Sequence, residues 1–317
     1  MSRIFITRQI PQPAIERLKQ VFTDVAFFAT DRNMTTAELI SSMQNCDVLL
    51  CMLNNVIDKT VIDANPNLKG ICNYAVGYNN IDIPYAVSKG IIVCNTPDVL
   101  TETTADLAWA LIMAASRRIV EGDRFTRQGK FTSWEPMQLL GRDVYNKTLG
   151  VIGMGRIGMA VAKRALGFGM KIIYYKTTGA ISDLPFPAEF TDFDALLKES
   201  DIISIHVPLT NQTRHLISKR EFNLLKHTAV LINTARGPIV DEKALVDALK
   251  EGRIFAAGLD VFENEPALEK GLADLPNVVI VPHIGSATIE TRTAMALLAA
   301  ENAIAVLKGT EPPARVT

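Results

Sequence analysis

The sequence predicts an α/β protein made of two Rossmann-like, doubly wound parallel-sheet domains, the first of them discontinuous and flavodoxin-like. Short β-rich runs alternate with helical patterns between residues 3 and 95, and a second such series runs from residue 148 to residue 281. This alternation is typical of βαβ units in a parallel sheet. A final helical stretch, residues 289–309, has no strand after it. We therefore expect it to pack back on the first domain.

The expected strands are short runs rich in β-branched and aromatic residues. In the first series they are RIFIT, VAFFA, DVLLCML, LKGICNYA and GIIVCN, with helical patterns such as PAIERLKQVF and TAELISSMQ between them. In the second series they are TLGVIG, KIIYY, DIISIHV, AVLINT, IFAAGLD and NVVIV. The expected domains are residues 1–98 with 288–317, and residues 99–287.

One long helical stretch, residues 101–128, joins the two series. Its first half is apolar on several faces rather than on one stripe, which indicates burial on more than one side. We expect that half to lie between domains or between subunits.

Composition excludes several classes of protein. Hydrophobic residues make up 48% of the 317 and charged residues 21%, so the chain is an ordinary globular protein rather than a disordered one. The formal net charge is -1 without a Lys/Arg cluster, so nucleic acid is not an expected partner. No apolar run spans a bilayer and no export signal is evident, so a cytoplasmic protein without a membrane partner is expected. The four cysteines form no CxxC pair and are expected to be buried, reduced thiols.

A glycine-rich turn follows the strand-like run TLGVIG and precedes a helical pattern. It reads GxGxxG and consists of Gly153, Met154, Gly155, Arg156, Ile157 and Gly158. In this setting glycines permit a tight turn and close backbone approach, and the helix N-terminus attracts a pyrophosphate. The motif therefore predicts a dinucleotide site.

The next expected strand ends at Tyr175, where an NAD-binding fold usually places an acidic residue on the ribose 2′-hydroxyl. This chain has Lys176, Thr177 and Thr178 instead. An ammonium and two hydroxyls can hold a 2′-phosphate that a carboxylate would repel, which favours NADP(H) and leaves NAD(H) as the alternative.

Three polar residues follow expected strands of the second series: Arg236, Glu265 and His283. Ligands of open α/β sheets collect at the carboxyl ends of the strands, so these side chains are the candidate catalytic set. Glu265 can orient the imidazole of His283 and favour its protonated form. Taken one at a time, each has a simpler interpretation: a surface ion pair for Arg236, a solvated loop position for Glu265, a structural histidine for His283. Of the other histidines, His206 ends an expected strand, while His215 and His227 are expected at the surface.

Four segments, GMGRIG, NTARGPIVDE, AAGLDVFENEP and PHIGSAT, resemble the signatures of the D-isomer-specific 2-hydroxyacid dehydrogenase family. The similarity extends over nearly the whole chain and implies two Rossmann-like domains with a discontinuous substrate domain. It also implies reduction of a 2-keto acid by hydride from a nicotinamide cofactor. Arg236 would then bind substrate and His283 would be the acid–base group.

The resemblance implies further site residues. Val76 and Gly77 would offer backbone amides to the substrate carboxylate. Asp260 would contact the nicotinamide carboxamide. The remaining positions expected to contact the cofactor are Thr104, Pro208, Thr234 and Gly285.

Within the family, residues 129–150 and 292–313 most resemble glyoxylate/hydroxypyruvate reductases. Trp134 matches a tryptophan that these enzymes insert into the active site of the neighbouring subunit, which implies a homodimer. A tryptophan on a loop is suited to such anchoring because it contributes a large area with few rotamers.

Two alternatives stay open at this point. One is another dehydrogenase of the family, acting on D-3-phosphoglycerate, D-lactate or 2-ketogluconate; residues 76–80 hold no basic group for a phosphorylated substrate. The other is a nucleotide-sensing corepressor-like binding protein with the same fold.

Overall fold

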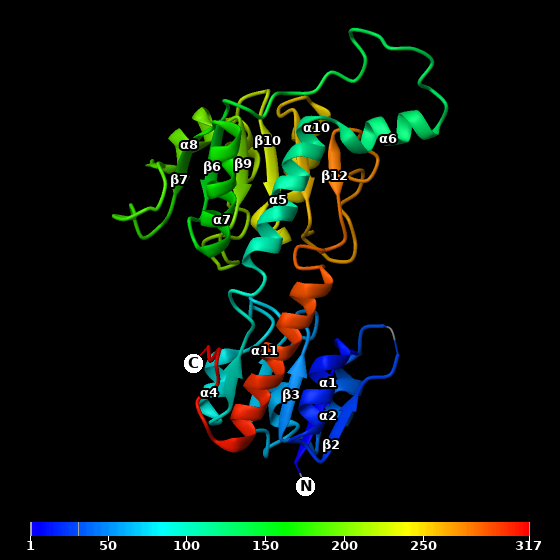
Figure 1. The fold of residues 1–317 in the computed structure, drawn as a ribbon, viewed down its shortest axis with the longest axis vertical. Coiled ribbons are helices and arrows are strands. Elements are labelled where there is room, and N and C mark those ends of the chain that lie inside the picture. Colours follow the sequence, from blue (N-terminus) through cyan, green and yellow to red (C-terminus); the bar gives the residue numbers. More distant parts are fainter. Residues whose placement is uncertain (1, 31, 317) are drawn as a thin grey trace. The chain divides into compact units, whose positions relative to one another are not determined.

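The computed structural model describes residues 2–30 and 32–316, and it divides the chain into two compact units. Unit 1 comprises Met1–Leu100 and Ser286–Thr317, and unit 2 comprises Thr101–Gly285. Each unit contains one parallel sheet with helices on its faces (Figure 1). The predicted fold class is confirmed.

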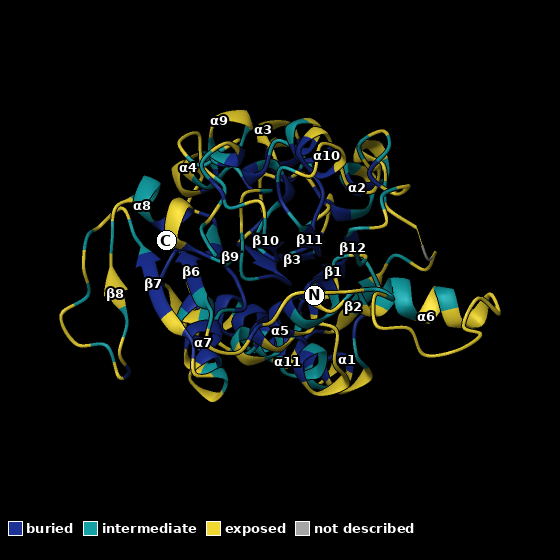
Figure 2. Cartoon of the chain, turned by 90° about the horizontal axis from the view of Figure 1, so that it is seen from above, coloured by how far each residue is buried: buried dark blue, intermediate teal, exposed yellow. Residues whose placement is uncertain are grey.

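Unit 1 has a five-stranded sheet in the order β2-β1-β3-β4-β5, with every pair parallel. This is the flavodoxin-like order. The strands β3 and β4 are buried along their whole length, as expected for the centre of a sheet covered on both faces (Figure 2). The elements are β1 (Arg3–Ile6), α1 (Gln12–Lys19), β2 (Asp24–Phe27), α2 (Thr36–Met43), β3 (Val48–Cys51), α3 (Lys59–Asp63), β4 (Gly70–Asn73), α4 (Ile83–Ser88), β5 (Ile92–Cys94) and α11 (Ile289–Lys308).

The last helix, α11, packs on α1 and on strands β3, β4 and β5 of unit 1, as predicted. Thr288 caps its N-terminus by accepting a hydrogen bond from the Thr291 N–H, and Gly309 ends it in the left-handed conformation at φ 68°. The buried Asn302 side chain donates to the Asn95 carbonyl at 2.9 Å and accepts from the Ala314 N–H at 2.9 Å. These bonds join the C-terminal segment to the end of β5.

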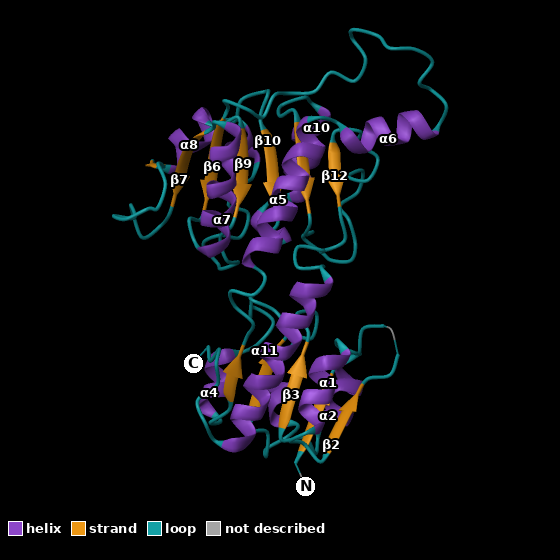
Figure 3. Cartoon of the chain, viewed as in Figure 1, coloured by secondary structure: helices purple, strands orange, loops and turns teal. Residues whose placement is uncertain are grey.

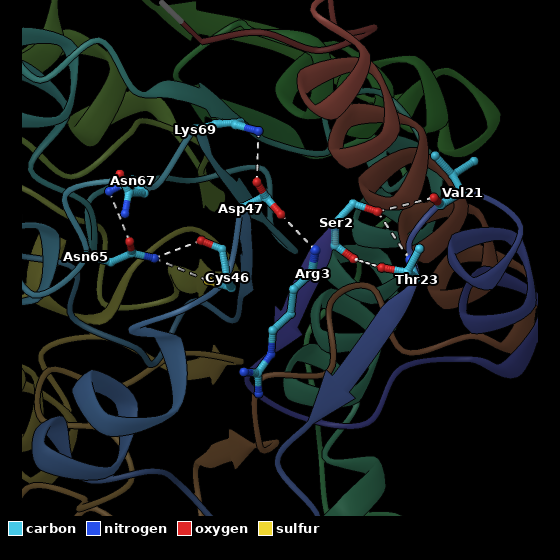
Figure 4. A network of polar contacts seen from close by, with 9 residues as sticks. All are labelled: Ser2, Arg3, Val21, Thr23, Cys46, Asp47, Asn65, Asn67 and Lys69. Atoms are coloured by element: carbon cyan, nitrogen blue, oxygen red, sulfur yellow. Dashed lines mark hydrogen bonds and ion pairs between the residues drawn. The ribbon is translucent and has the colours of Figure 1, made fainter.

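A polar network holds the amino-terminal edge of the unit 1 sheet (Figure 4). The Asp47 carboxylate accepts from the Arg3 N–H and from Lys69 Nζ, both at 2.8 Å. The buried Asn65 amide donates to the carbonyls of Met43 and Cys46 at 2.7 and 2.8 Å. The network therefore fixes the starts of β1, β3 and β4 at the edge opposite their carboxyl ends.

Unit 2 has a seven-stranded parallel sheet in the order β12-β11-β10-β9-β6-β7-β8, the doubly wound arrangement of a dinucleotide-binding fold (Figure 3). The order reverses beside β6, from which the chain first runs to β7 and later returns to β9. The elements are α5 (Thr101–Ser116), α6 (Ile119–Arg127), β6 (Thr148–Ile152), α7 (Arg156–Ala165), η1 (Leu166–Phe168), β7 (Lys171–Tyr175), β8 (Glu189–Phe190), α8 (Phe193–Glu199), β9 (Ile202–Ile205), α9 (Lys219–Phe222), β10 (Val230–Asn233), η2 (Gly237–Ile239), α10 (Glu242–Lys250), β11 (Ala256–Leu259) and β12 (Val278–Ile280).

The long helical stretch predicted for residues 101–128 is two helices, so that prediction was wrong in its continuity. Helix α5 ends at Ser116, and Arg118 adopts a left-handed conformation at φ 52° before α6 begins. The apolar faces of α5 are buried within unit 2 itself, where the helix packs on β10, β11 and α7. Its Trp109 ring stacks on Phe168 with centroids 4.5 Å apart. The core of unit 2 thus accounts for the apolar pattern.

Cys46, Cys51, Cys72 and Cys94 are free and buried, as predicted. No helix within the described residues combines the length and the apolar character needed to cross a membrane.

Candidate active site

The candidate cofactor and catalytic residues of unit 2 lie at the carboxyl ends of its parallel strands. The glycine turn follows β6, Arg236 follows β10, Asp260 follows β11, and His283 follows β12. Since all these strands run in the same direction, the residues after them share one edge of the sheet. The structure therefore brings them to one side of unit 2.

The glycine turn has the geometry that a dinucleotide requires. Gly153 has φ 97°, and a Cβ there would lie 2.7 Å from the His206 carbonyl. A Cβ at Gly158 would lie 2.1 Å from the Gly153 oxygen, so helix and turn pack too closely for a side chain. Gly155 instead faces open space at the N-terminus of α7, where backbone N–H groups favour a phosphate. The turn therefore fits a pyrophosphate.

Lys176 directly follows β7. The end of β7 lies beside the glycine turn, since the Gly153 N–H donates to the Tyr175 carbonyl at 2.9 Å. Lys176 is partly exposed, and Thr177 and Thr178 are exposed. No carboxylate occupies the three positions that follow β7.

Other predicted cofactor residues lie around the same edge. Thr234 follows β10, and its Oγ1 is buried without a hydrogen-bond partner among the described residues. A Cβ at Gly285 would lie 3.0 Å from the Asp260 carboxylate and 3.6 Å from the Thr104 side chain, so these three residues are neighbours. Pro208 is exposed on the loop that follows β9.

Glu265 and His283 form a direct pair, with 2.9 Å between the Glu265 Oε2 and the His283 Nδ1. The other carboxylate oxygen of Glu265 accepts the Phe262 N–H at 3.0 Å, which fixes the plane of the group. Burial alone would raise the pKa of Glu265, but the hydrogen bond and charge of His283 outweigh it and bring that pKa below its ordinary value. Glu265 is therefore an ionised partner for the imidazole.

Arg236 lies within electrostatic reach of this pair. The pKa of its guanidinium is lowered by burial, while the charge of Glu265 opposes that shift. Its Nη1 donates to the Ala235 carbonyl at 2.6 Å, and the Arg236 carbonyl accepts from the Asn233 side chain at 2.9 Å. The structure thus brings together the three predicted catalytic residues.

Asp260 holds the loop that carries His283. It is 1% exposed, and its two carboxylate oxygens accept the N–H groups of Ile284 at 2.6 Å and Gly285 at 2.8 Å. Its carbonyl accepts the His283 N–H at 2.9 Å, and His283 has φ 53°. Burial raises the pKa of Asp260 to about 6. Sequence reasoning placed Asp260 only on the cofactor, and its hydrogen bonds to the His283 loop were missed.

Two further histidines lie close to the candidate site. His215 is exposed, as predicted, and its Nε2 lies 2.6 Å from the Glu263 carboxylate, next to the Glu265 turn. His206 hydrogen-bonds to Ser204 at 2.8 Å, and burial of its ring lowers its pKa to about 3. His206 is therefore uncharged at neutral pH beside the glycine turn.

The remaining predicted residues lie elsewhere. Val76 and Gly77 are partly exposed in the loop after β4 of unit 1. Trp134 is 80% exposed in the segment after α6 of unit 2.

Comparison with known proteins agrees with this geometry. Residues 109–285 match the family model described as D-isomer specific 2-hydroxyacid dehydrogenase, NAD binding domain. A glyoxylate reductase of Thermococcus gammatolerans is 48% identical over 99% of this chain and 95% of its own length. One of Thermococcus litoralis is 49% identical over 98% of this chain and 95% of its own.

Solved structures are similar over the full length. A Thermus thermophilus protein is 44% identical with a TM-score of 0.92, covering 99% of this chain and 100% of that one. The NADPH-dependent glyoxylate/hydroxypyruvate reductase of Sinorhizobium meliloti, solved with NADP and malonate, is 32% identical with a TM-score of 0.89, covering 100% and 97%. The chain therefore belongs to the D-isomer specific 2-hydroxyacid dehydrogenase family and is a nicotinamide-dependent dehydrogenase.

Proposed function

We propose that this enzyme reduces small 2-keto acids, glyoxylate and hydroxypyruvate, to the corresponding D-2-hydroxy acids, with NADPH as the preferred hydride donor. The observation that carries the proposal is the Glu265–His283 pair beside Arg236 at the ligand edge of a dinucleotide-binding unit. Relatives that are 48% and 49% identical to this chain are named glyoxylate reductases, which supports the choice of substrate.

The residues divide the chemistry between them. A nicotinamide cofactor bound at the glycine turn would supply the hydride for the carbonyl carbon. Arg236 binds the carboxylate and polarises the carbonyl oxygen, and the N–H groups of Val76 and Gly77 bind the carboxylate from unit 1. His283 has its Nδ1 on Glu265, which leaves Nε2 to give a proton to the oxygen as it gains negative charge. Glu265 orients the ring and stabilises the imidazolium.

We assign nucleotide binding to unit 2, which also carries the substrate-binding Arg236 and His283, while Val76 and Gly77 belong to unit 1. In unit 2 the glycine turn, with Arg156 and Ile157 on the first turn of α7, would hold the pyrophosphate. Asp260, Thr104, Thr234, Pro208 and Gly285 would surround the rest of the cofactor.

The preference for NADP(H) rests on Lys176. Its position directly after β7, beside the glycine turn, suits the 2′-phosphate, and Thr177 can donate a hydroxyl hydrogen bond. Lysine is a less exacting phosphate partner than a bidentate arginine, so we expect NADH to be used as well.

We propose that the enzyme works as a homodimer. Helix α6 has no buried residue, and the segment after it leads away from the unit 2 sheet (Figure 1). Large apolar side chains are exposed on α6 and on the segment after it, namely Ile119, Phe131, Trp134, Met137 and Leu140. Such a surface is typical of an interface, and Trp134 would reach the active site of the second copy. Sedimentation equilibrium of the wild type and of Trp134→Ala measures the assembly, and a monomeric wild type would contradict it. The cytoplasmic location expected from the sequence stays a prediction.

The decisive experiment is measurement of initial rates with glyoxylate, hydroxypyruvate, pyruvate and 2-ketogluconate, each with NADPH and with NADH. We expect the highest kcat/KM with glyoxylate or hydroxypyruvate and NADPH. A higher value with 2-ketogluconate or pyruvate would reassign the substrate within the family. Absence of turnover with all four would refute the reductase and favour a nucleotide-binding role.

A further inference from the structure

The loop after β4 has three successive carbonyl groups that are each held by a hydrogen bond. The Ala75 oxygen accepts the Thr96 N–H at 2.9 Å. The Val76 oxygen accepts from the Asn95 side-chain amide at 2.8 Å, and the Gly77 oxygen accepts from the Asn73 amide at 2.8 Å. The orientation of each peptide plane in the loop is therefore fixed.

Fixing a carbonyl also fixes the N–H of the same peptide. These peptides are trans, so the N–H points away from its own C=O. The carbonyls of Ala75 and Val76 point toward the adjacent residues Asn95 and Thr96 at the end of β5. The N–H groups of Val76 and Gly77 consequently both point away from β5.

These two N–H groups donate no hydrogen bond within the described part of the chain. Both residues are partly exposed. Successive N–H groups that share a direction form a concave site for an anion without any side-chain charge.

Asn95 and Asn73 are themselves firmly held. Asn73 is 1% exposed, and its amide group also contacts the Asn80 side chain at 3.2 Å. Asn95 is 8% exposed; its N–H donates to the Ala314 carbonyl at 3.1 Å, and its carbonyl accepts from Asn302 at 2.9 Å. The donors to the loop are thus anchored in the sheet and in the C-terminal segment.

We propose that Asn95 is a positioning residue that, together with the Thr96 N–H, orients the N–H groups of Val76 and Gly77 toward the substrate carboxylate. The inference rests on the proposed function, which places a carboxylate at these two amides. Asn95 does not touch substrate; it acts by holding the Val76 carbonyl, whose peptide carries the Gly77 N–H. The arrangement binds one carboxylate with neutral donors and therefore suits a small, singly charged 2-keto acid.

The test compares Asn95→Asp, which keeps the size but removes the donor, with Asn95→Ala, in case the buried charge unfolds the first variant. We expect the KM for glyoxylate to rise about 10- to 100-fold, because a hydrogen bond to a charged group is misaligned. The kcat should stay within about 3-fold and the Kd of NADPH should be unchanged, since only substrate binding is altered.

Asn65→Asp is the matched control. Asn65 is also buried and donates to two backbone carbonyls, but it lies at the opposite edge of the same sheet (Figure 4). It should lower the melting temperature and leave the KM unchanged. A wild-type KM in both folded Asn95 variants, or an equal rise in Asn65→Asp, would overturn the proposal.

A readout without turnover separates this inference from the proposed function. In the ¹⁵N-labelled enzyme, oxamate, an unreactive analogue of a 2-keto acid, should shift the Val76 and Gly77 amide resonances in the wild type and much less in Asn95→Asp. If the wild type reduces no 2-keto acid but these shifts occur, the reductase assignment fails and the positioning role stands. Absence of the shifts in the wild type would refute the positioning role.

Discussion

Gly237 follows Arg236 and packs against the backbone of the turn that leads to Glu265. We therefore expect Gly237→Ala to lower both the catalytic rate and the stability of the fold. A Cβ at this position would lie 1.9 Å from the carbonyl of Phe262 and 2.4 Å from the Glu263 nitrogen. Both contacts are with backbone, so no side-chain rotation can relieve them. Gly237 is not among the glycines with positive φ, and lack of space alone excludes a side chain.

The size of the effect follows from this overlap. Ordinary contact begins at 3.4 Å, so the two turns must separate by about 1.5 Å. Overpacking of this kind costs about 1–3 kcal/mol of folding free energy. A shift of about 1 Å in a catalytic group reduces the rate about 100-fold, so we expect kcat/KM for glyoxylate to fall at least that far. The displacement of Phe262 would also move Glu265, because the Glu265 carboxylate accepts a hydrogen bond from the Phe262 N–H.

The assay combines steady-state kinetics with thermal unfolding. A loss of 1 kcal/mol corresponds to about 2–4 °C for a unit of this size. The control is Gly167→Ala, because Gly167 lies in η1 and a Cβ added there would have nothing within 4 Å. This change should leave kcat/KM intact and the melting temperature equal or higher. If Gly237→Ala keeps wild-type kinetics and stability, the close packing of Gly237 against the Phe262–Glu263 backbone does not constrain the site, and the reasoning is refuted.

Three other substitutions test the site. His283→Gln should lower kcat about 10²- to 10⁴-fold with little change in the Kd of NADPH measured by fluorescence; unchanged turnover would remove His283 from the mechanism. Lys176→Asp should reduce the ratio of kcat/KM for NADPH over NADH about 10-fold or more, and an unaltered ratio would mean that Lys176 does not face the 2′-phosphate. Because the pKa of Asp260 is raised to about 6, ionisation of Asp260 disfavours the folded state progressively as the pH rises from about 4 to 6. The unfolding free energy of Asp260→Asn relative to wild type should therefore increase by about 2 kcal/mol between pH 4.5 and 7.5 in urea titrations, and a constant difference would contradict the shift.

The order of strands and helices could be predicted from sequence because strand-like runs and helical periodicity are local signals. The break between α5 and α6 could not. Arg118 adopts φ 52° without a glycine to mark it. The conformation is held by distant residues: the Arg142 N–H donates to the Ser116 carbonyl at 2.8 Å, and a Cβ at Gly141 would lie 2.4 Å from that oxygen. A tertiary contact, rather than local propensity, ends the helix.

In the candidate site, too, local sequence signals predict some features, while contacts between distant residues determine others. Arg236, Glu265 and His283 could be predicted because each follows a strand, and parallel strands bring such positions to one edge. The support around them could not be predicted, since it joins residues far apart in the chain. The Glu263 N–H donates to the buried Glu242 at 2.7 Å, and the Glu263 carboxylate contacts His215. Nothing in the local sequence distinguishes these residues from solvated charges.

Asp260 and Glu265 show how one loop holds two carboxylates in opposite electrostatic states. Asp260 is deeply buried, and although it accepts two backbone N–H groups, burial dominates and raises its pKa to about 6. Glu265 is more exposed and faces an imidazole, which outweighs burial and lowers its pKa. As the pH falls, Asp260 therefore takes up a proton before Glu265 does. Mild acidification should therefore neutralise the carboxylate that holds the His283 loop, while the carboxylate that orients the imidazole stays charged.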